Sequence, residues 1–198
     1  MKYLAPGIVV FSQAFLTLFT GLLIATDRNS SFLTRLYVSK AKSYEFIFSY
    51  SLSLLPVTVV QSALFFIIGG IFDTSLFGLG MIFAVLLSII TSFFFIAMGI
   101  LFGSLCNEKS VGGIASIIIT GQSLLSGMWF PAEGLDSGMI TFMSVLPFKN
   151  ATLLIQNAVN GINDGFNDFL LPLLIVAGYA TAAFIAAITV FRSKMKEK

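Results

Sequence analysis

Long runs of apolar residues, separated by short polar segments, dominate the chain. Five of these runs lie at about 4–26, 46–71, 77–104, 111–130 and 169–191. A helix needs about 20 apolar residues to cross about 30 Å of hydrocarbon, and each run is long enough. None of the runs has a charged residue in its interior. The pattern predicts an all-α integral membrane protein with five transmembrane helices, organised as a single membrane domain over residues 1–198.

The first run has an alternative interpretation as a secretory signal, because Lys2 precedes an apolar stretch near the start of the sequence. The run is longer than the roughly 7–15 residues of a typical signal core, and no A-x-A-like cleavage site follows it. We therefore expect residues 4–26 to remain in the protein as a span.

Polar residues inside the runs are Ser, Thr and Gln. Such side chains usually form hydrogen bonds between membrane helices, although some can line a pathway for an amphipathic substrate. Gly99 and Gly103 form a G-x-x-x-G pattern, which is typical of closely packed helices. Carriers driven by protons or sodium usually keep an ionisable residue in the bilayer, and these runs have none. If the chain moves a substrate, we expect the energy to come from elsewhere.

The composition supports a membrane protein and excludes several other classes. The chain is 57% hydrophobic and only 10% charged, whereas soluble domains have about 25% charged residues. The net charge of +2 is too small to indicate a nucleic-acid partner. Cys106 is the single cysteine, and the absence of histidine excludes histidine-based metal sites and acid–base catalysis. No Walker lysine loop occurs, and the aqueous segments are too short for an enzyme domain, so we expect no catalytic residues and no metal site.

The basic residues predict the orientation of the chain. Nine of the eleven lie in the loop between the first two runs, in the loop after the third run and in the C-terminal tail. Only Lys2 and Lys149 lie on the other side. Because cytoplasmic loops are the positive ones, we expect the N-terminus outside and the C-terminus in the cytoplasm.

The longest cytoplasmic loop, residues 27–45, contains an amphipathic helical pattern. Phe32, Leu33, Leu36 and Tyr37 are spaced so that they share one apolar helix face, with basic residues around them. Two interpretations are open. The helix either lies on anionic lipid or inserts its apolar face into a groove on a cytoplasmic partner.

The external segment, residues 131–168, is too irregular to be another span. Pro131 disfavours continuation of the preceding helix, and Pro147 divides the following residues into two short amphipathic helices. One interpretation is a surface cap in which Trp129 and Phe130 are interfacial anchors. The other is a pair of half-buried re-entrant helices that dip into the outer leaflet, return, and close the external mouth of a pathway.

Several of these segments together resemble the permease subunit of type-2 ABC transporters. They are "YLAPGIVVFS", "ATDRNSSFLTRLYVSKAKSYEFI", "IAMGILFGSLCNEKSVGG" and "LLSGMWFPAEGL" followed by "LPFKNATLLIQNAV". The resemblance covers essentially the whole chain in the family's order, and its most specific element is SG-x-x-F-P followed by LP. Members of that family usually have six spans and a cytoplasmic N-terminus. On this alignment Met1 falls almost at the start of the family's second span, so the first span is expected to be missing from this sequence. A proline that follows the family's cytoplasmic helix is replaced here by "SKAKS".

The resemblance implies a membrane-spanning subunit of an ATP-driven exporter. Its expected location is the cell membrane, specifically a prokaryotic plasma membrane. Its partners would be a cytoplasmic ABC ATPase, which binds ATP and Mg, and a second permease chain, identical or homologous. The loop helix would be the coupling helix that contacts the ATPase, with docking by Phe32, Leu33, Arg35 and Leu36. The outer gate would be formed by Trp129, Phe130, Pro131 and Pro147. The alternative is a membrane scaffold or partner-binding subunit that transports nothing.

Overall fold

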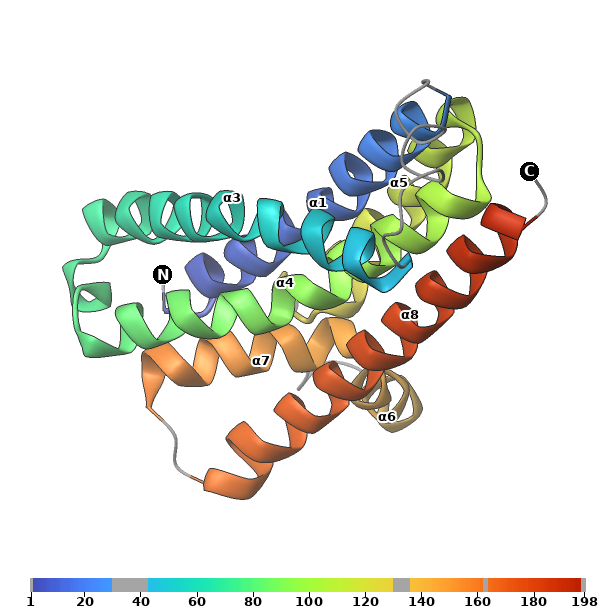
Figure 1. The fold of residues 1–198 in the computed structure, drawn as a ribbon. Coiled ribbons are helices and arrows are strands. Elements are labelled where there is room, and N and C mark those ends of the chain that lie inside the picture. Colours follow the sequence, from blue (N-terminus) through green and yellow to red (C-terminus); the bar gives the residue numbers. More distant parts are fainter. Residues whose placement is uncertain (1, 30–42, 130–135, 162–163, 197–198) are drawn as a thin grey trace.

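The computed structural model of the protein describes residues 2–29, 43–129, 136–161 and 164–196 (Figure 1). Within these ranges the chain is all helical, with seven α-helices and no strands, as the sequence predicts. The helices are α1 (Leu4–Asn29), α3 (Ser43–Phe72), α4 (Leu79–Leu105), α5 (Glu108–Leu125), α6 (Ser137–Val145), α7 (Pro147–Asn160) and α8 (Leu171–Lys196). A 3-10 turn, Thr74–Leu76 (η1), joins α3 to α4, and a π-helical turn, Gly165–Leu170 (η3), leads into α8.

Four helical segments are long and apolar enough to cross a membrane. They are Leu4–Arg28, Tyr44–Phe72, Leu79–Leu105 and Gly165–Ser193, and they confirm four of the five expected spans. The bent pair α6–α7 passes the same test when it is taken as one element. The expected fourth span corresponds to α5, which has 18 residues and begins with the charged Glu108 and Lys109, so hydropathy alone does not identify it as a span.

The segment that contains α5 nevertheless packs along much of α1. A Cβ atom placed on Gly21 would lie 2.7 Å from Val111, and one placed on Gly7 would lie 2.6 Å from Met128. Gly21 lies in the second half of α1, and Gly7 lies near its start. The segment from Val111 to Met128 therefore runs antiparallel to α1 over the stretch from Gly21 to Gly7.

The centre of the bundle is the contact between α1 and α4, which pack together more extensively than any other pair of described helices. A Cβ atom on Gly99 would lie 2.7 Å from the carbonyl oxygen of Thr17, and one on Gly103 would lie 2.6 Å from that of Gly21. No side chain fits at these distances, so the two backbones approach each other directly. The structure confirms the close helix packing that the G-x-x-x-G pattern predicts.

Polar residues inside the spans join helices to one another. Gln13 of α1 is fully buried; its amide group donates to the carbonyl oxygen of Ser88 (3.1 Å) and accepts from the hydroxyl of Thr91 (2.7 Å). Thr17 donates to the carbonyl oxygen of Phe95 at 3.0 Å. On the other side of α1, Gln61 of α3 donates to the hydroxyl of Ser12 at 2.6 Å. These residues have the interhelical role that the sequence favours for most of the polar positions.

The exposed turn before α8 is capped by Asp164, which lies outside the spans. Its carboxylate accepts hydrogen bonds from the side chain of Asn167 (2.6 Å) and from the backbone amides of Phe166 (3.0 Å) and Asn167 (3.4 Å). These bonds, the one from the Asn167 side chain above all, hold the pKa of the Asp164 carboxyl below its ordinary value, because they stabilise the charged form.

Candidate functional site

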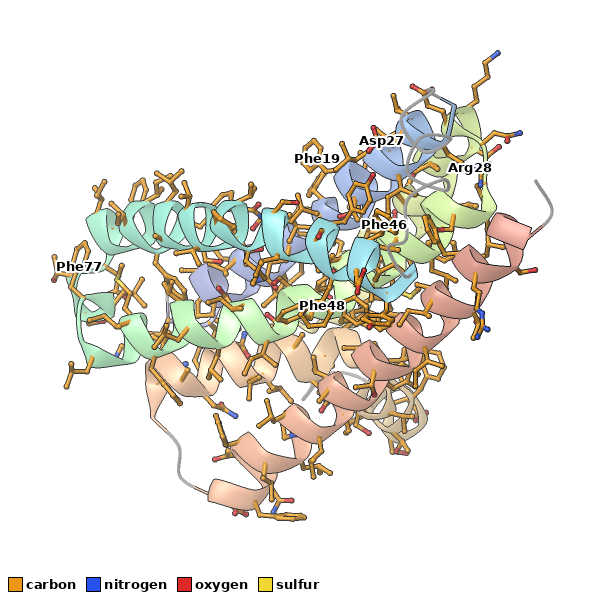
Figure 2. The ribbon with its side chains drawn as sticks, in the orientation of Figure 1. Phe19, Asp27, Arg28, Phe46, Phe48 and Phe77 are labelled. Atoms are coloured by element: carbon orange, nitrogen blue, oxygen red, sulfur yellow. The ribbon has the colours of Figure 1, made fainter. Side chains whose placement is uncertain are left out.

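The helices converge at the end of the bundle where α1 finishes, which we call the loop end because residues 30–42 follow α1 there (Figure 2). The Arg28 guanidinium donates to the carbonyl oxygens of Ser104 and, at 3.3 Å, Cys106, where α4 ends. A cation is favoured at this position because the last carbonyls of a helix lack partners within it. Next to it, the Tyr50 hydroxyl donates to the Asp27 carboxylate at 2.6 Å and joins α3 to α1.

Aromatic packing extends the loop end to α8. The rings of Phe46, near the start of α3, and Phe191, near the end of α8, have centroids 6.5 Å apart. Ile47 is fully buried beside them. The residues that flank the loop on both sides are therefore fixed to α4 and α8, so a force on the loop would reach several helices at once.

The four predicted docking residues, Phe32, Leu33, Arg35 and Leu36, lie outside the described residues. Their role stays a prediction from the sequence. The structure adds the anchors on either side of them, Asp27, Arg28 and Tyr50, which the sequence analysis did not single out. Arg28 and Asp27 were visible in the sequence only as loop charges, because their partners are backbone carbonyls and a tyrosine far along the chain.

At the opposite end, which we call the N-terminal end, Met128 and the end of α7 both lie close to the start of α1. Met128, shortly before the bent pair α6–α7, packs against Gly7 near the start of α1. At the end of α7, the side-chain amides of Gln156 and Asn160 donate to the carbonyl oxygens of Tyr3 (2.9 Å) and Lys2 (3.3 Å). The chain therefore lies near the start of α1 both shortly before the bent pair and at the end of α7; the re-entrant interpretation of the pair stays a prediction.

The turn between α6 and α7 reaches the middle depth of the bundle. The rings of Phe148, in the first turn of α7, and Phe94 of α4 have centroids 6.0 Å apart. Phe94 is about 22 Å from the start of α4 and about 17 Å from its end, at 1.5 Å per residue. Further along α7, the carbonyl oxygens of Ala158 and Val159 approach Gly80, near the start of α4. Helix α7 therefore begins about halfway down α4 and runs back toward the N-terminal end (Figure 1).

A buried asparagine holds the 83° bend between the two short helices. Asn150 is 4% exposed, and its side-chain amide donates to the carbonyl oxygens of Ser144 and Leu146, both at 2.7 Å. Pro147 is buried at the first position of α7, where its missing N–H costs nothing. The sequence analysis identified Pro147 but missed Asn150, because its acceptors are backbone carbonyls that no residue pattern reveals.

The structure places two of the four predicted gate residues, and it places them at different depths. Trp129 follows Met128 near the N-terminal end; it is 52% exposed, and its indole N–H donates to the Ser123 hydroxyl at 3.1 Å. Pro147 is buried at the turn between α6 and α7, at the depth of Phe94. Phe130 and Pro131 lie outside the described residues. The assignment of all four to one gate stays a prediction.

A groove of about 710 Å³ lies between the re-entrant pair and α8, open at the surface of the described chain. Its wall includes Leu153 and Asn150 of α7, Leu174 and Tyr179 of α8, and the charged side chain of Lys149. Lys149 follows Phe148 in the chain, so its backbone lies about halfway along α4. Its assignment to the external side of the membrane stays a prediction from the distribution of the basic residues.

In the part of the chain that the structure describes, no three His, Cys, Asp or Glu residues are grouped so as to hold a metal ion. The features that stand out are a set of anchors at the loop end, a re-entrant pair at the N-terminal end and a groove beside it.

Comparison with known proteins gives one match. The sequence model of the family described as "ABC-2 family transporter protein" matches residues 1–189. No curated protein matches the chain, and no solved structure matches it.

Proposed function

The chain belongs to the ABC-2 family of transporter membrane proteins, and from this premise we propose that it is the membrane-spanning permease subunit of an ATP-driven exporter. The observation that carries the proposal is the family match over residues 1–189, together with helices that make the chain a multi-pass membrane protein. The permease has no ATPase site of its own. A separate cytoplasmic ABC ATPase binds ATP and Mg, and a second permease chain, identical or homologous, completes the pathway.

The ATPase docks on the loop that follows α1, through Phe32, Leu33, Arg35 and Leu36. The charge distribution supports this placement, since nine of the eleven basic residues lie on the loop side, which the positive-inside rule makes cytoplasmic. The anchors Arg28 and Tyr50 support it as well, because they link the loop to α4 and α3. When ATP draws the two ATPase subunits together, this linkage moves the spans as rigid bodies.

The outer gate is formed by the re-entrant pair and the residues before it, with Trp129, Phe130, Pro131 and Pro147 as its parts. A broken segment at membrane depth is tolerated where protein or a water-filled cavity satisfies its backbone. Asn150 supplies that satisfaction at the bend, so the pair can close the pathway without leaving polar backbone groups in contact with lipid.

The proposal is tested by purifying the tagged full chain from membranes with mild detergent and identifying what copurifies. We expect an ABC ATPase subunit to be present, and to be lost in a Leu33→Asp, Leu36→Asp double variant that still inserts into the membrane. The control is Thr74→Asp, Ser75→Asp, which adds the same charge at the exposed η1 turn on the opposite side. Purification of the intact chain without any ATPase would refute the exporter proposal and favour a membrane scaffold.

A further inference from the structure

The groove between α7 and α8 contains the charged side chain of Lys149, and a charge at the depth of this residue is energetically unfavourable. Among the described residues that line the groove, Lys149 is the one charged side chain, and no described residue forms an ion pair or hydrogen bond with its ammonium group. Phe148 and Phe94 place its backbone halfway along α4, itself one of the candidate spans. Ionisable residues at such depth face a cavity or a pathway, and they mark binding sites because an isolated charge in hydrocarbon is unfavourable.

The start of α7 adds to the positive potential of this site. Leu146, which precedes the helix, offers no side-chain cap to the first amides of α7. The N-terminus of a helix has a partial positive charge, and Lys149 lies in the first turn. Two positive features therefore meet at the deep end of the groove, with no described carboxylate among the lining residues to balance them.

The rest of the groove is apolar and elongated. Its α8 wall runs from Asn167, in the turn before α8, to Ala182. The ring of Tyr179 on this wall lies 6.3 Å from that of Phe94, and so at the depth of Lys149. Fifteen residues of helix correspond to about 22 Å. Leu153, Leu174 and Ile175 line the space between these points. The volume of about 710 Å³ lies within the range of about 300–1,000 Å³ that is usual for ligand pockets.

We propose that this groove binds an amphipathic anion with a single hydrocarbon chain, whose anionic group pairs with Lys149 and whose chain lies along Leu153, Leu174 and Ile175. The charge of Lys149 selects the anion, and the apolar wall of α8 selects the chain. That such anions are the transported substrates rests on the proposed function; the binding itself requires neither an ATPase nor transport.

Binding is measured on the purified full chain in phosphatidylcholine nanodiscs, with Tyr179→Trp as a reporter inside the groove. The probe is lysophosphatidylglycerol with a brominated acyl chain, which quenches nearby tryptophan. The control is lysophosphatidylcholine with the same chain, which is zwitterionic and has no net charge. The protein that retains Tyr179 gives the background signal of Trp129, the single native tryptophan. We expect half-saturation at a concentration at least about fivefold lower for the anionic probe, because only that probe has a net negative charge to pair with Lys149; fivefold corresponds to about 1 kcal/mol.

Four variants separate the effect of charge from the effect of space in the groove. Lys149→Met should abolish the preference for the anionic probe, and Lys149→Arg should keep it. Gly178→Phe should remove quenching by both probes, because a side chain at Gly178 enters open space in the groove. Gly113→Phe makes the same change at an equally open position on α5 and should leave binding intact.

Equal affinity for the two probes, or a preference that survives in Lys149→Met, would overturn the proposal. If Lys149→Met does not give a monodisperse protein, Gly178→Phe decides: unchanged quenching in that variant refutes binding in the groove. A shift from dimer to monomer in Gly178→Phe, without any charge preference in the parent protein, would instead make the groove an interface between two copies. None of these outcomes depends on whether an ATPase copurifies. The proposed function can therefore be refuted while the binding site is confirmed, and the binding site can be refuted while the proposed function is confirmed.

Discussion

Replacement of Asn150 by Ala would show how the re-entrant pair keeps its bend. The Asn150 side-chain amide uses both of its hydrogens, one for the carbonyl oxygen of Ser144 and one for that of Leu146, each at 2.7 Å. Ser144 lies in the last turn of α6, and Leu146 is the single residue between α6 and α7. Truncation to Ala removes both bonds and leaves the carbonyls without these partners.

The expected cost follows from the two bonds and from burial. A neutral intramolecular hydrogen bond stabilises a protein by about 1 kcal/mol, and an unsatisfied buried carbonyl costs somewhat more. Asn150 is 4% exposed, so water replaces its amide poorly, whereas Ser144 is exposed and its carbonyl regains part of the loss. We estimate that the local opening of the bend becomes easier by about 2 kcal/mol, which corresponds to about 30-fold.

Hydrogen exchange of the protein in detergent measures this opening directly. Amides at the start of α7 should exchange about 30-fold faster in Asn150→Ala, while amides in the centre of α1 and α4 should keep their rates. The matched control is Asn157→Ala on the same helix, which loses one bond to the carbonyl oxygen of Asp168 (2.8 Å) and should affect η3 rather than the bend. Unchanged exchange at the start of α7 in Asn150→Ala would refute the assignment of the bend to this residue.

Three further predictions concern the bundle and its ends. Gly103→Ala should destabilise the protein by about 1–3 kcal/mol in a thermal unfolding assay, because the new Cβ would lie 2.6 Å from a backbone oxygen of α1. The control is Gly113→Ala, where the new Cβ enters open space, and this variant should have an equal or higher melting temperature. Arg28→Met should loosen the end of α4 and speed maleimide labelling of Cys106, the single cysteine, severalfold; an unchanged rate would contradict the anchoring role. The cap by Asp164 should be present at pH 5–7, where the carboxylate is charged. It should be lost as the pH falls below about 3.9, the ordinary carboxyl pKa, and through the lower pKa of the folded state. Hydrogen exchange in η3, corrected for the intrinsic rate, should therefore rise only in that acid range. An Asp164→Asn variant should show no such acid step.

The spans were predictable because their signal does not depend on tertiary structure. A long uncharged run has few alternatives to a helix across the bilayer, and four of the five runs behave accordingly. The G-x-x-x-G pattern also predicted close packing correctly. The partner helix was not predictable, because nothing in the residues of α4 identifies α1 rather than another span as the surface that approaches Gly99 and Gly103.

The end of the fourth run shows the effect of a single residue. The apolar run continues to 130, but α5 ends at Leu125. Gly127 has φ +73°, a backbone conformation that favours glycine, and it turns the chain out of the helix. Composition alone does not reveal this break, since Met128 and Trp129 are as apolar as the residues before it.

The depths of Lys149 and Asn150 in the bundle could not be predicted from the sequence. Both lie in a segment that reads as external because it is short, broken and polar. Their depth is set by the packing of Phe148 on Phe94, a contact between residues 54 positions apart in the sequence. Depth within a membrane protein is a tertiary property, so the groove and the depth of the bend became visible only with the structure, although the break at Pro147 was predictable from the sequence.

The most direct test of the coupling account is site-specific photocrosslinking in intact membranes. A photoreactive amino acid would replace Leu36, in the loop after α1, and in a second strain Ser75, in the exposed η1 turn at the opposite end. The account predicts a crosslink to an ABC ATPase subunit from position 36 and none from position 75. A crosslink to the ATPase from position 75, or its absence from position 36 in a chain that copurifies with the ATPase, would contradict the proposed docking site and the orientation of the chain.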